Sequence, residues 1–282
     1  MSRQLTRPVI SFFVPKTKWG RWSGKPDWHP DVAQASVWIR SYQLAPYLTE
    51  LGYHVTCNQT DPLPDVGIFL RRYNFPNVTL ARQIKAHGGK VIVDIVVNYF
   101  ESRQATSLKY GGAAPELVES FLSLVSLADQ VWAVSPFLQS QAACVHPSAY
   151  FVSDSVDPAH FCIARHISSQ VKKPLVLGWS GTAAKAHALE EIAALLQAHI
   201  LKKEVQVLVI SNDKPRLSFP FTFEKWHYST FPKHIARCDL CIAPRRVDNN
   251  YDRGHSLFKI GVFMAAGIPA LAGPVPAYSL LL

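Results

Sequence analysis

The chain has 282 residues, a length that favours about two domains. Hydrophobic residues make up 48% of it and charged residues 17%, which excludes an intrinsically disordered chain. The 29 Lys and Arg residues exceed the 20 Asp and Glu residues, for a formal net charge of +9. Such a balance favours phosphate-bearing or other anionic partners, without choosing among nucleotides, nucleic acid and lipid headgroups.

The charge is unevenly distributed along the chain. Residues 1–110 carry 14 basic and 7 acidic side chains, and residues 165–282 carry 15 basic and 8 acidic ones. Residues 111–164 between them contain 5 acidic side chains and neither Lys nor Arg. Two interpretations remain open: scattered solvated surface, or two basic walls that face an anionic ligand. No run of like charges reaches the length of a nucleic-acid-binding tail.

The ends and the cysteines indicate a cytoplasmic protein. The N-terminal apolar stretch is short and Pro15 interrupts it, so it does not resemble a secretory signal, and no apolar run is long enough to span a membrane. An odd number of widely spaced cysteines favours reduced thiols. Cys238 and Cys241 form a CxxC pair without a second pair of metal ligands, and their apolar surroundings favour a buried strand, so we expect no metal site.

Strand and helix patterns alternate along the first half. Apolar runs predict strands over residues 9–14, 53–57, 66–70, 90–97, 130–134 and 150–152, and helical spacing predicts helices over 36–51, 78–87 and 115–127. The alternation predicts parallel strands joined by βαβ crossovers.

The same alternation starts again after a segment that is rich in proline and polar residues. The second half has predicted strands over 175–179, 205–210, 240–243 and 269–272, and helices over 185–201, 230–237 and 256–266. The predicted fold is therefore α/β, with two Rossmann-like doubly wound domains facing a cleft. They cover residues 1–157 and 175–282, and residues 158–174 form a linker.

Ligands in such sheets bind beyond the carboxyl ends of the strands, and three of those ends are rich in small and basic residues. The segment 16–25, after the first strand, contains Gly20 and Arg21 and could hold a phosphate, a sugar or an acceptor; a basic loop without a function is the alternative. The segment 178–185 places Gly181 and Lys185 before a predicted helix, where free amides and the helix dipole favour an anion. It is neither a Walker A loop nor a GxGxxG motif.

The third strand end, residues 244–259, is the most basic. Ser256 is a candidate N-cap of the helix that follows, which would leave backbone amides exposed to an anion. Lys259, about one turn into that helix, would direct its ammonium group toward the same anion. Together with Arg245 and His255, these residues predict a diphosphate site.

These segments, in this order, resemble a known family. The sequences ADQVWAVS at 128–135, VDPAHF at 156–161, GWSG at 178–181 and HSLFK…MAAGIP at 255–269 are similar to motifs of GT-B fold glycosyltransferases, especially the retaining family-4-like enzymes (glycosyl transferases group 1). The last segment is the most specific. The resemblance spans most of residues 36–282.

The resemblance implies sugar transfer from a nucleotide-sugar donor, such as a UDP-sugar, that binds mainly to the second domain. Lys259 and Ser256 would hold the diphosphate, while Gly181 and Lys185 would approach it from the first loop of that domain. The acceptor, a saccharide or a lipid-linked sugar, would dock on the first domain, where peripheral contact with a membrane is also conceivable. Such enzymes use neither metal nor cofactor, because basic side chains and helix N-termini stabilise the departing diphosphate.

Three positions and the C-terminal end depart from the family pattern. Gly254 and Val262 stand where the family has glutamates, the second of which often holds the ribose, and His255 stands where the family has lysine. The chain ends after its last predicted strand, where family members continue, so we expect a truncated or naturally short second domain.

The remaining functional candidates are groups that could act as acid or base. Asp94 lies near the end of an apolar strand and His29 in a polar, aromatic loop; either could take the acceptor proton in an inverting enzyme. Asn98 and Asp129 are weaker candidates. A retaining enzyme needs no such base, because the departing phosphate can accept the proton.

Two other functions compete with glycosyl transfer. The departures at 254 and 262 favour a non-catalytic glycosyltransferase-like protein that binds sugar or a partner chain. The basic, tryptophan-rich first loop would suit nucleic acid, but no nucleic-acid-binding motif is present, and we expect no such partner.

Overall fold

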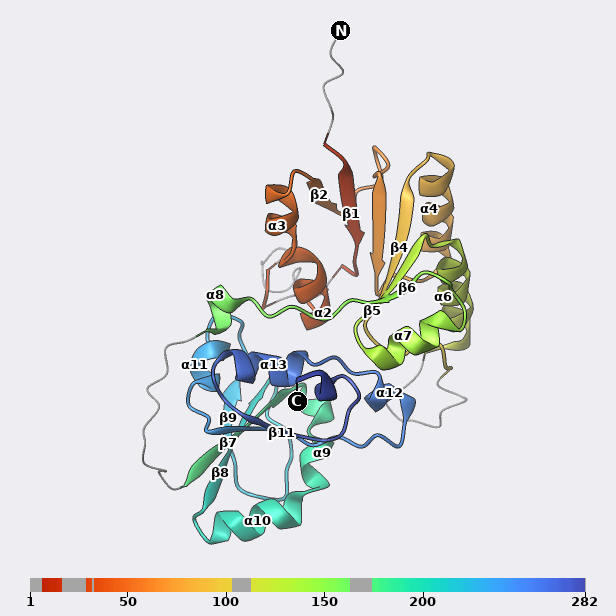
Figure 1. Cartoon of the computed structure of the whole chain (residues 1–282). Coiled ribbons are helices and arrows are strands. Elements are labelled where there is room, and N and C mark those ends of the chain that lie inside the picture. The colour runs from red at the N-terminus through yellow and green to blue at the C-terminus, as the bar shows by residue number, and fades with distance from the viewer. Residues whose placement is uncertain (1–6, 17–28, 32, 103–112, 163–173, 282) are drawn as a thin grey trace. The chain divides into compact units, whose positions relative to one another are not determined.

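The computed structural model of the chain describes residues 7–16, 29–31, 33–102, 113–162 and 174–281 (Figure 1). The chain divides into two compact units, each built around its own sheet. The first comprises Met1–Asp154 together with Arg253–Ser256, and the second comprises Ser155–Asp252 together with Leu257–Leu282. Both sheets are parallel and both are covered by helices, which confirms the predicted α/β class.

The first unit contains a six-stranded parallel sheet in the order β2-β1-β3-β4-β5-β6. Its strands are β1 (Val9–Phe13), β2 (His54–Cys57), β3 (Val66–Leu70), β4 (Lys90–Ile95), β5 (Gln130–Ala133) and β6 (Ala149–Phe151). β3 and β4 are buried along nearly their whole length, which explains their uninterrupted apolar sequences. The chain adds β2 on one side of β1 and all later strands on the other, so the strand order reverses between β1 and β3.

Helices cover both faces of this sheet. They are α2 (Ala35–Val37), the π-helix η1 (Trp38–Tyr42), α3 (Ala45–Glu50), α4 (Phe75–Ala86), α6 (Pro115–Leu127) and α7 (Pro136–Ala143). α4 and α6 lie side by side, and α3 lies beside β2 (Figure 1). Ser135 is the N-cap of α7, and its hydroxyl accepts a hydrogen bond from the Leu138 amide.

The single helix predicted over 36–51 is wrong: the segment forms three short pieces, α2, η1 and α3. The Ser41 hydroxyl donates a hydrogen bond to the Val37 carbonyl within the π-turn. Pro46 lies in the first turn of α3, where its missing amide breaks no helical hydrogen bond. The π-turn carries Arg40, which is buried. π-turns are rare and often occur at functional or specialised positions.

The second unit contains a five-stranded parallel sheet in the order β11-β10-β7-β8-β9. The strands are β7 (Leu175–Gly181), β8 (Val205–Ser211), β9 (Thr222–Lys225), β10 (Leu240–Ala243) and β11 (Ala270–Ala272). Here the order reverses between β7 and β10. Along β8, Leu208 and Ile210 belong to one buried cluster, whereas Val207 and Val209 belong to another, so both faces of the sheet are covered.

Short helices make up the rest of this unit. They are α8 (Pro158–Phe161), η2 (Ala183–Lys185), α9 (His187–Glu190), α10 (Ala193–Leu201), α11 (Phe231–Ile235), α12 (Asn250–Arg253), α13 (Phe258–Ala265) and η3 (Tyr278–Leu281). The long helix predicted over 185–201 is thus wrong. It is interrupted where Ile192 leaves helical geometry, next to Glu190, whose carboxylate accepts hydrogen bonds from the amide and hydroxyl of Ser218.

The boundary between the units differs from the predicted one at 157. It falls between Asp154 and Ser155, and α8, inside the predicted linker, belongs to the second unit. Phe161 is 1% exposed in that unit's core. His160 stacks on Tyr228 at a centroid distance of 3.9 Å, and its Nε2 lies 2.9 Å from the Tyr228 carbonyl oxygen. The later part of the predicted linker, residues 163–173, is outside the described residues.

No helix among the described residues is long and apolar enough to cross a bilayer.

Candidate functional site

Three cations gather in the second unit where its strand order reverses. Lys185 lies in η2, just after β7; Arg245 follows β10; and Lys259 is in the first turn of α13. β7 and β10 are neighbours in the sheet, so their carboxyl ends meet. In open parallel sheets, the crevice at such a reversal is the usual place for a ligand. The structure therefore brings together the Lys185, Arg245 and Lys259 of the predicted diphosphate site.

Lys259 is the most confined of the three. Its ammonium nitrogen lies 4.5 Å from the centroid of the Trp179 ring, which is fully buried in β7. A Cβ atom on Gly181 would lie 3.3 Å from that nitrogen and 2.8 Å from the indole, so only glycine leaves room here. Burial lowers the pKa of Lys259 well below its ordinary value, and repulsion by Arg245 and Lys185 lowers it further. An anion at this position would relieve that repulsion.

Arg245 is held in place by an acidic side chain and by close backbone packing. Its Nη1 donates to Asp252 at 2.6 Å, and Asn249 also donates to Asp252, at 2.9 Å. A Cβ on Gly273 would lie 2.5 Å from the Arg245 carbonyl oxygen, so glycine permits β11 and the Arg245 backbone to approach. Arg245 Nε is buried and has no hydrogen-bond partner of good geometry among the described residues. The residue therefore retains donor capacity.

Tyr278 adds a hydroxyl group next to Arg245. Burial raises the pKa of the phenol, while the nearby Arg245 charge opposes the rise. Tyr278 belongs to η3, after the last strand, and no motif in the sequence marked it. Its hydroxyl lies beside Arg245, whose charge acts on the phenol.

The loop after β7 differs from the predicted anion cradle. The Ala183 amide already donates to Asn212 Oδ1 at 2.9 Å, and the Lys185 amide donates to the Thr182 carbonyl at 2.8 Å. Lys185 itself lies 5.4 Å from the Tyr251 ring centroid. This loop therefore contributes the charge of Lys185 and the small size of Gly181 to the candidate site. The amides of Ala183 and Lys185 already donate hydrogen bonds within the protein.

The predicted N-cap at Ser256 is wrong. α13 begins at Phe258 with Leu257 as its N-cap residue, and no side chain caps it. Residues 253–256 group with the first unit, where the Ser135 hydroxyl donates to the Gly254 carbonyl at 3.0 Å and Arg253 lies 4.8 Å from the Phe137 ring centroid. These contacts hold the backbone before Phe258 outside the helix. His255 and Ser256 thus belong to the first unit, whereas Lys185, Arg245 and Lys259 belong to the second.

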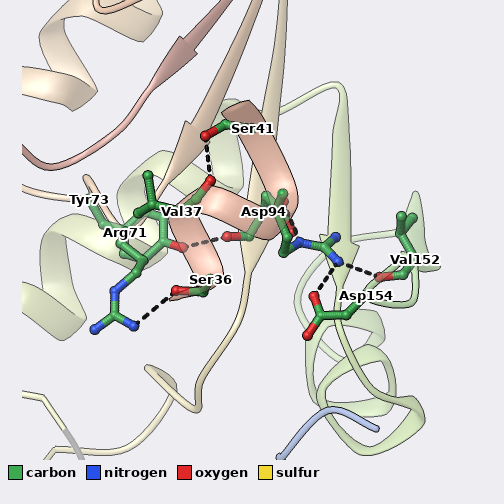
Figure 2. A network of polar contacts seen from close by, with 9 residues as sticks. Ser36, Val37, Ser41, Arg71, Tyr73, Asp94, Val152 and Asp154 are labelled. Atoms are coloured by element: carbon green, nitrogen blue, oxygen red, sulfur yellow. Dashed lines mark hydrogen bonds and ion pairs between the residues drawn. The ribbon is translucent and has the colours of Figure 1, made fainter. Parts of the chain in front are cut away.

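In the first unit, Asp94 belongs to a buried ion-pair network (Figure 2). Arg40 Nε donates to Asp94 Oδ2 at 2.7 Å, and Arg40 Nη1 donates to Asp154 at 3.1 Å and to the Val152 carbonyl at 2.9 Å. Burial opposes the charge on Arg40, but Asp94 and Asp154 raise its pKa above the ordinary value. Burial raises the pKa of Asp94, with Arg40 opposing. This geometry ties η1 to the ends of β4 and β6.

The other candidate base and the first loop lie at the margin of the described structure. His29 Nδ1 accepts from the Asp31 amide at 3.2 Å and lies 3.9 Å from its carboxylate. No contact joins His29 to Asp94 among the described residues. Gly20 and Arg21 are outside those residues. Asp129 accepts from the Val91 amide and pairs with Lys85, so it joins strand β4 to helix α4.

Sequence reasoning missed Arg40, Trp179 and Tyr278. For Arg40 a signal existed: a charged residue among the apolar Val37, Trp38 and Ile39 requires a buried partner. In the described part of the chain, no group of three or more His, Cys, Asp or Glu side chains could hold a metal ion.

No protein-family model and no curated protein matches the chain. Among solved structures, TarM of S. aureus is 12% identical over 73% of this chain and 40% of its own, with a TM-score of 0.50. S. aureus MnaA in complex with UDP is 9% identical. The match covers 95% of this chain and 79% of MnaA, with a TM-score of 0.47. The kitacinnamycin glycotransferase is 12% identical. The match covers 98% of this chain and 84% of that protein, with a TM-score of 0.43.

The chain thus spans about two fifths of the length of TarM. Identities this low show the fold alone. Two parallel α/β sheets, each doubly wound and each in its own unit, place this chain in the GT-B fold that its sequence predicted.

Proposed function

We propose that this protein is a glycosyltransferase that takes a sugar from a nucleoside-diphosphate-sugar donor. The observation that carries the proposal is the charge imbalance at the reversal point of the second sheet. Lys185, Arg245 and Lys259 gather there, and Asp252 pairs with Arg245. A diphosphate has the charge, and the oxygen acceptors, that this arrangement would complement.

The same cations have a direct role in the proposed reaction. The bond between the sugar's anomeric carbon and the diphosphate oxygen breaks, and negative charge grows on the departing nucleoside diphosphate. Lys259 and Arg245 stabilise that charge from fixed positions, which lowers the barrier more than mobile water does. We propose that no divalent metal is needed, since the side chains supply the positive charge.

We further propose that the reaction retains the anomeric configuration. An inverting enzyme needs a base that reaches the acceptor hydroxyl. Asp94, the strongest candidate, is 1% exposed and engaged with Arg40. In a retaining reaction the departing phosphate takes the acceptor proton, so no such base is required. The acceptor, a saccharide or a lipid-linked sugar, docks on the first unit.

Donor binding is the fairest test, because it does not require the acceptor to be known. Calorimetry of the full chain with UDP, GDP and ADP, and with their glucose conjugates, should reveal one base that binds. Lys259→Met should weaken that binding by roughly 10- to 100-fold, the value of one charge-assisted contact. Lys233→Met, which removes an exposed lysine from α11 of the same unit, is the matched control and should bind as the parent does.

Two outcomes would contradict the proposal: no binding by any of these nucleotides, or equal affinity in the parent and Lys259→Met. With an acceptor in hand, proton NMR of the first product formed reports the anomeric configuration. Turnover that survives EDTA would support a metal-independent reaction.

Val262 favours one alternative, a non-catalytic protein that binds a sugar nucleotide. It stands where the resemblance implies a ribose-binding glutamate, and it is 1% exposed in the core of the second unit. If the nucleotide binds but neither transfer nor donor hydrolysis is detected, the alternative is the better description. Hydrolysis that Lys259→Ala abolishes would argue against it.

A further inference from the structure

We propose that Arg71, which follows β3 in the first unit, binds an anionic group, phosphate or carboxylate, on the acceptor. That the ligand is the acceptor rests on the proposed function, whereas the site itself rests on the first unit alone. Arg71 and Arg72 come directly after β3, and the strand order of this sheet reverses between β1 and β3. The two arginines thus lie at the edge of the sheet where a ligand is expected.

Neither arginine has an acidic partner in the described structure. Arg71 Nη1 donates to the Ser36 hydroxyl at 3.3 Å, and Arg72 Nη1 donates to Asn58 Oδ1 at 3.0 Å. Both acceptors are neutral. A guanidinium carries several more donors in a planar fork that matches phosphate and carboxylate. Figure 2 shows the guanidinium of Arg71 joined to Ser36 by a dashed line.

One buried arginine and another half-buried one show what is unusual here. Arg40 pairs with Asp94 and Asp154, and Arg245 pairs with Asp252. Among the described arginines, Arg71 and Arg72 are the half-buried ones without such a pair. A half-buried cation that faces neutral oxygens retains much of its desolvation cost, which an incoming anion would offset.

The backbone of Arg71 supports the same conclusion. Its φ of 58° is in the left-handed region, which arginine rarely adopts and which glycine or asparagine adopts more easily. Strain of this kind tends to persist where it positions a functional side chain. Asn58, with a φ of 56°, occupies the same region, and its side chain also accepts from the Val14 amide, so it joins the ends of β1 and β3. Arg72 therefore contributes to this junction of strand ends through Asn58, whereas Arg71 contacts the Ser36 hydroxyl and does not take part in the junction.

The test uses three probes that differ in one group: glucose 6-phosphate, glucuronate and glucose. Binding to the full chain is measured by ligand-observed NMR. One anionic probe should bind at least about tenfold more tightly than glucose, and the better of the two identifies the acceptor group. Arg71→Asn should remove that advantage, because asparagine keeps the left-handed backbone but not the charge. Arg82→Asn, at an exposed arginine on α4, should leave the advantage intact.

Lys259→Met separates this site from the nucleotide site. It should leave probe binding unchanged while it weakens nucleoside diphosphate binding, and Arg71→Asn should do the reverse. If Lys259→Met, and not Arg71→Asn, abolishes probe binding, the anion occupies the second unit and the inference is overturned. It is also overturned if neither anion binds better than glucose. Failure of nucleotide binding alone would refute the proposed function and leave this site standing.

A melting temperature distinguishes binding from a purely structural role. Arg71→Asn relieves a left-handed arginine, so it should melt at the same temperature as the parent or higher. If the variant melts clearly lower and the probes bind it as tightly as they bind the parent, Arg71 is a structural residue.

Discussion

The two units handle a confined cation in opposite ways. In the first, Arg40 is 4% exposed and two carboxylates, from Asp94 and Asp154, lie within 3.1 Å of its guanidinium. In the second, Lys259 lies near two further cations, and Asp252, an acid whose charge acts on it, is engaged with Arg245. In the first unit, carboxylates of the chain itself balance the charge of the arginine, although Asp94 Oδ1 has no hydrogen-bond partner among the described residues. In the second unit, we propose that an external anion balances the charge of the lysine. This difference in charge matching is our reason for treating the first as a structural network and the second as a candidate binding site.

The largest expected effect comes from breaking the matched network. Arg40→Met would leave two carboxylates facing each other without their cation, and loss of one partner of a buried ion pair costs about 3–5 kcal/mol. Urea unfolding should show that loss in the free energy of unfolding. Arg82→Met, at an exposed arginine, should change it little. A loss below about 1 kcal/mol for Arg40→Met would remove the contrast between the two units.

Lys259→Met should have the opposite effect on stability. It removes a desolvated cation that Arg245 and Lys185 repel, so the free energy of unfolding should stay constant or rise by about 1 kcal/mol. The same variant is expected to lose donor affinity. Urea unfolding of the ligand-free chain measures the first effect. A variant that is clearly less stable than Lys233→Met would mean that Lys259 supports the fold.

The pH dependence follows from the lowered pKa of Lys259. Between that pKa and the ordinary value of 10.5, the unfolded chain binds a proton that the folded chain releases, so stability rises with pH across this window. A bound diphosphate favours the charged lysine, so binding takes up a proton and affinity falls with rising pH, by about tenfold per unit at most. Calorimetry with the nucleotide in buffers of different ionisation enthalpy, at pH values between the lowered pKa and 10.5, measures that proton uptake. The uptake should vanish in Lys259→Met.

The smallest expected effect concerns the space beside Lys259. In Gly181→Ala the new methyl group would lie 2.8 Å from the Trp179 ring and 3.3 Å from the Lys259 nitrogen. Both the lysine and the buried indole would have to shift by a few tenths of an ångström, and we expect donor affinity to fall about three- to tenfold. Gly261→Ala, whose methyl group would meet the end of Leu257 at 3.3 Å, is the control and should bind normally. Equal binding by both variants would mean that the lysine's position is not critical.

Local patterns in the sequence predicted much of the fold. β3, β10 and α6 have the predicted bounds, because buried parallel strands are continuous apolar runs and α6 starts at Pro115. The breaks in the helices predicted over 36–51 and 185–201 depend on tertiary contacts, such as those of Arg40 and Glu190. Helix α7 was not predicted, although Ser135 and Pro136 are a helix-start signal.

The cations of the candidate site were predictable because each follows a strand or begins a helix, where parallel sheets place their ligand groups. Their surroundings were not. Tyr278 and Trp179 come from segments far apart in the chain, and Arg40 meets partners 54 and 114 residues away. Such distances leave no periodicity to detect, so the difference between matched and unmatched charge emerges only from the folded chain.

The packing of α8 determines where the two units could be separated. A second-unit fragment cut at residue 175, after the predicted linker, would lose Phe161 and uncover the rings of Phe231 and Phe258 that it contacts. A fragment that starts at Ser155 would keep this aromatic cluster and the stacking of His160 on Tyr228. Division of the two units, whether for a fragment or for a chimera, should therefore place the cut or the junction before α8.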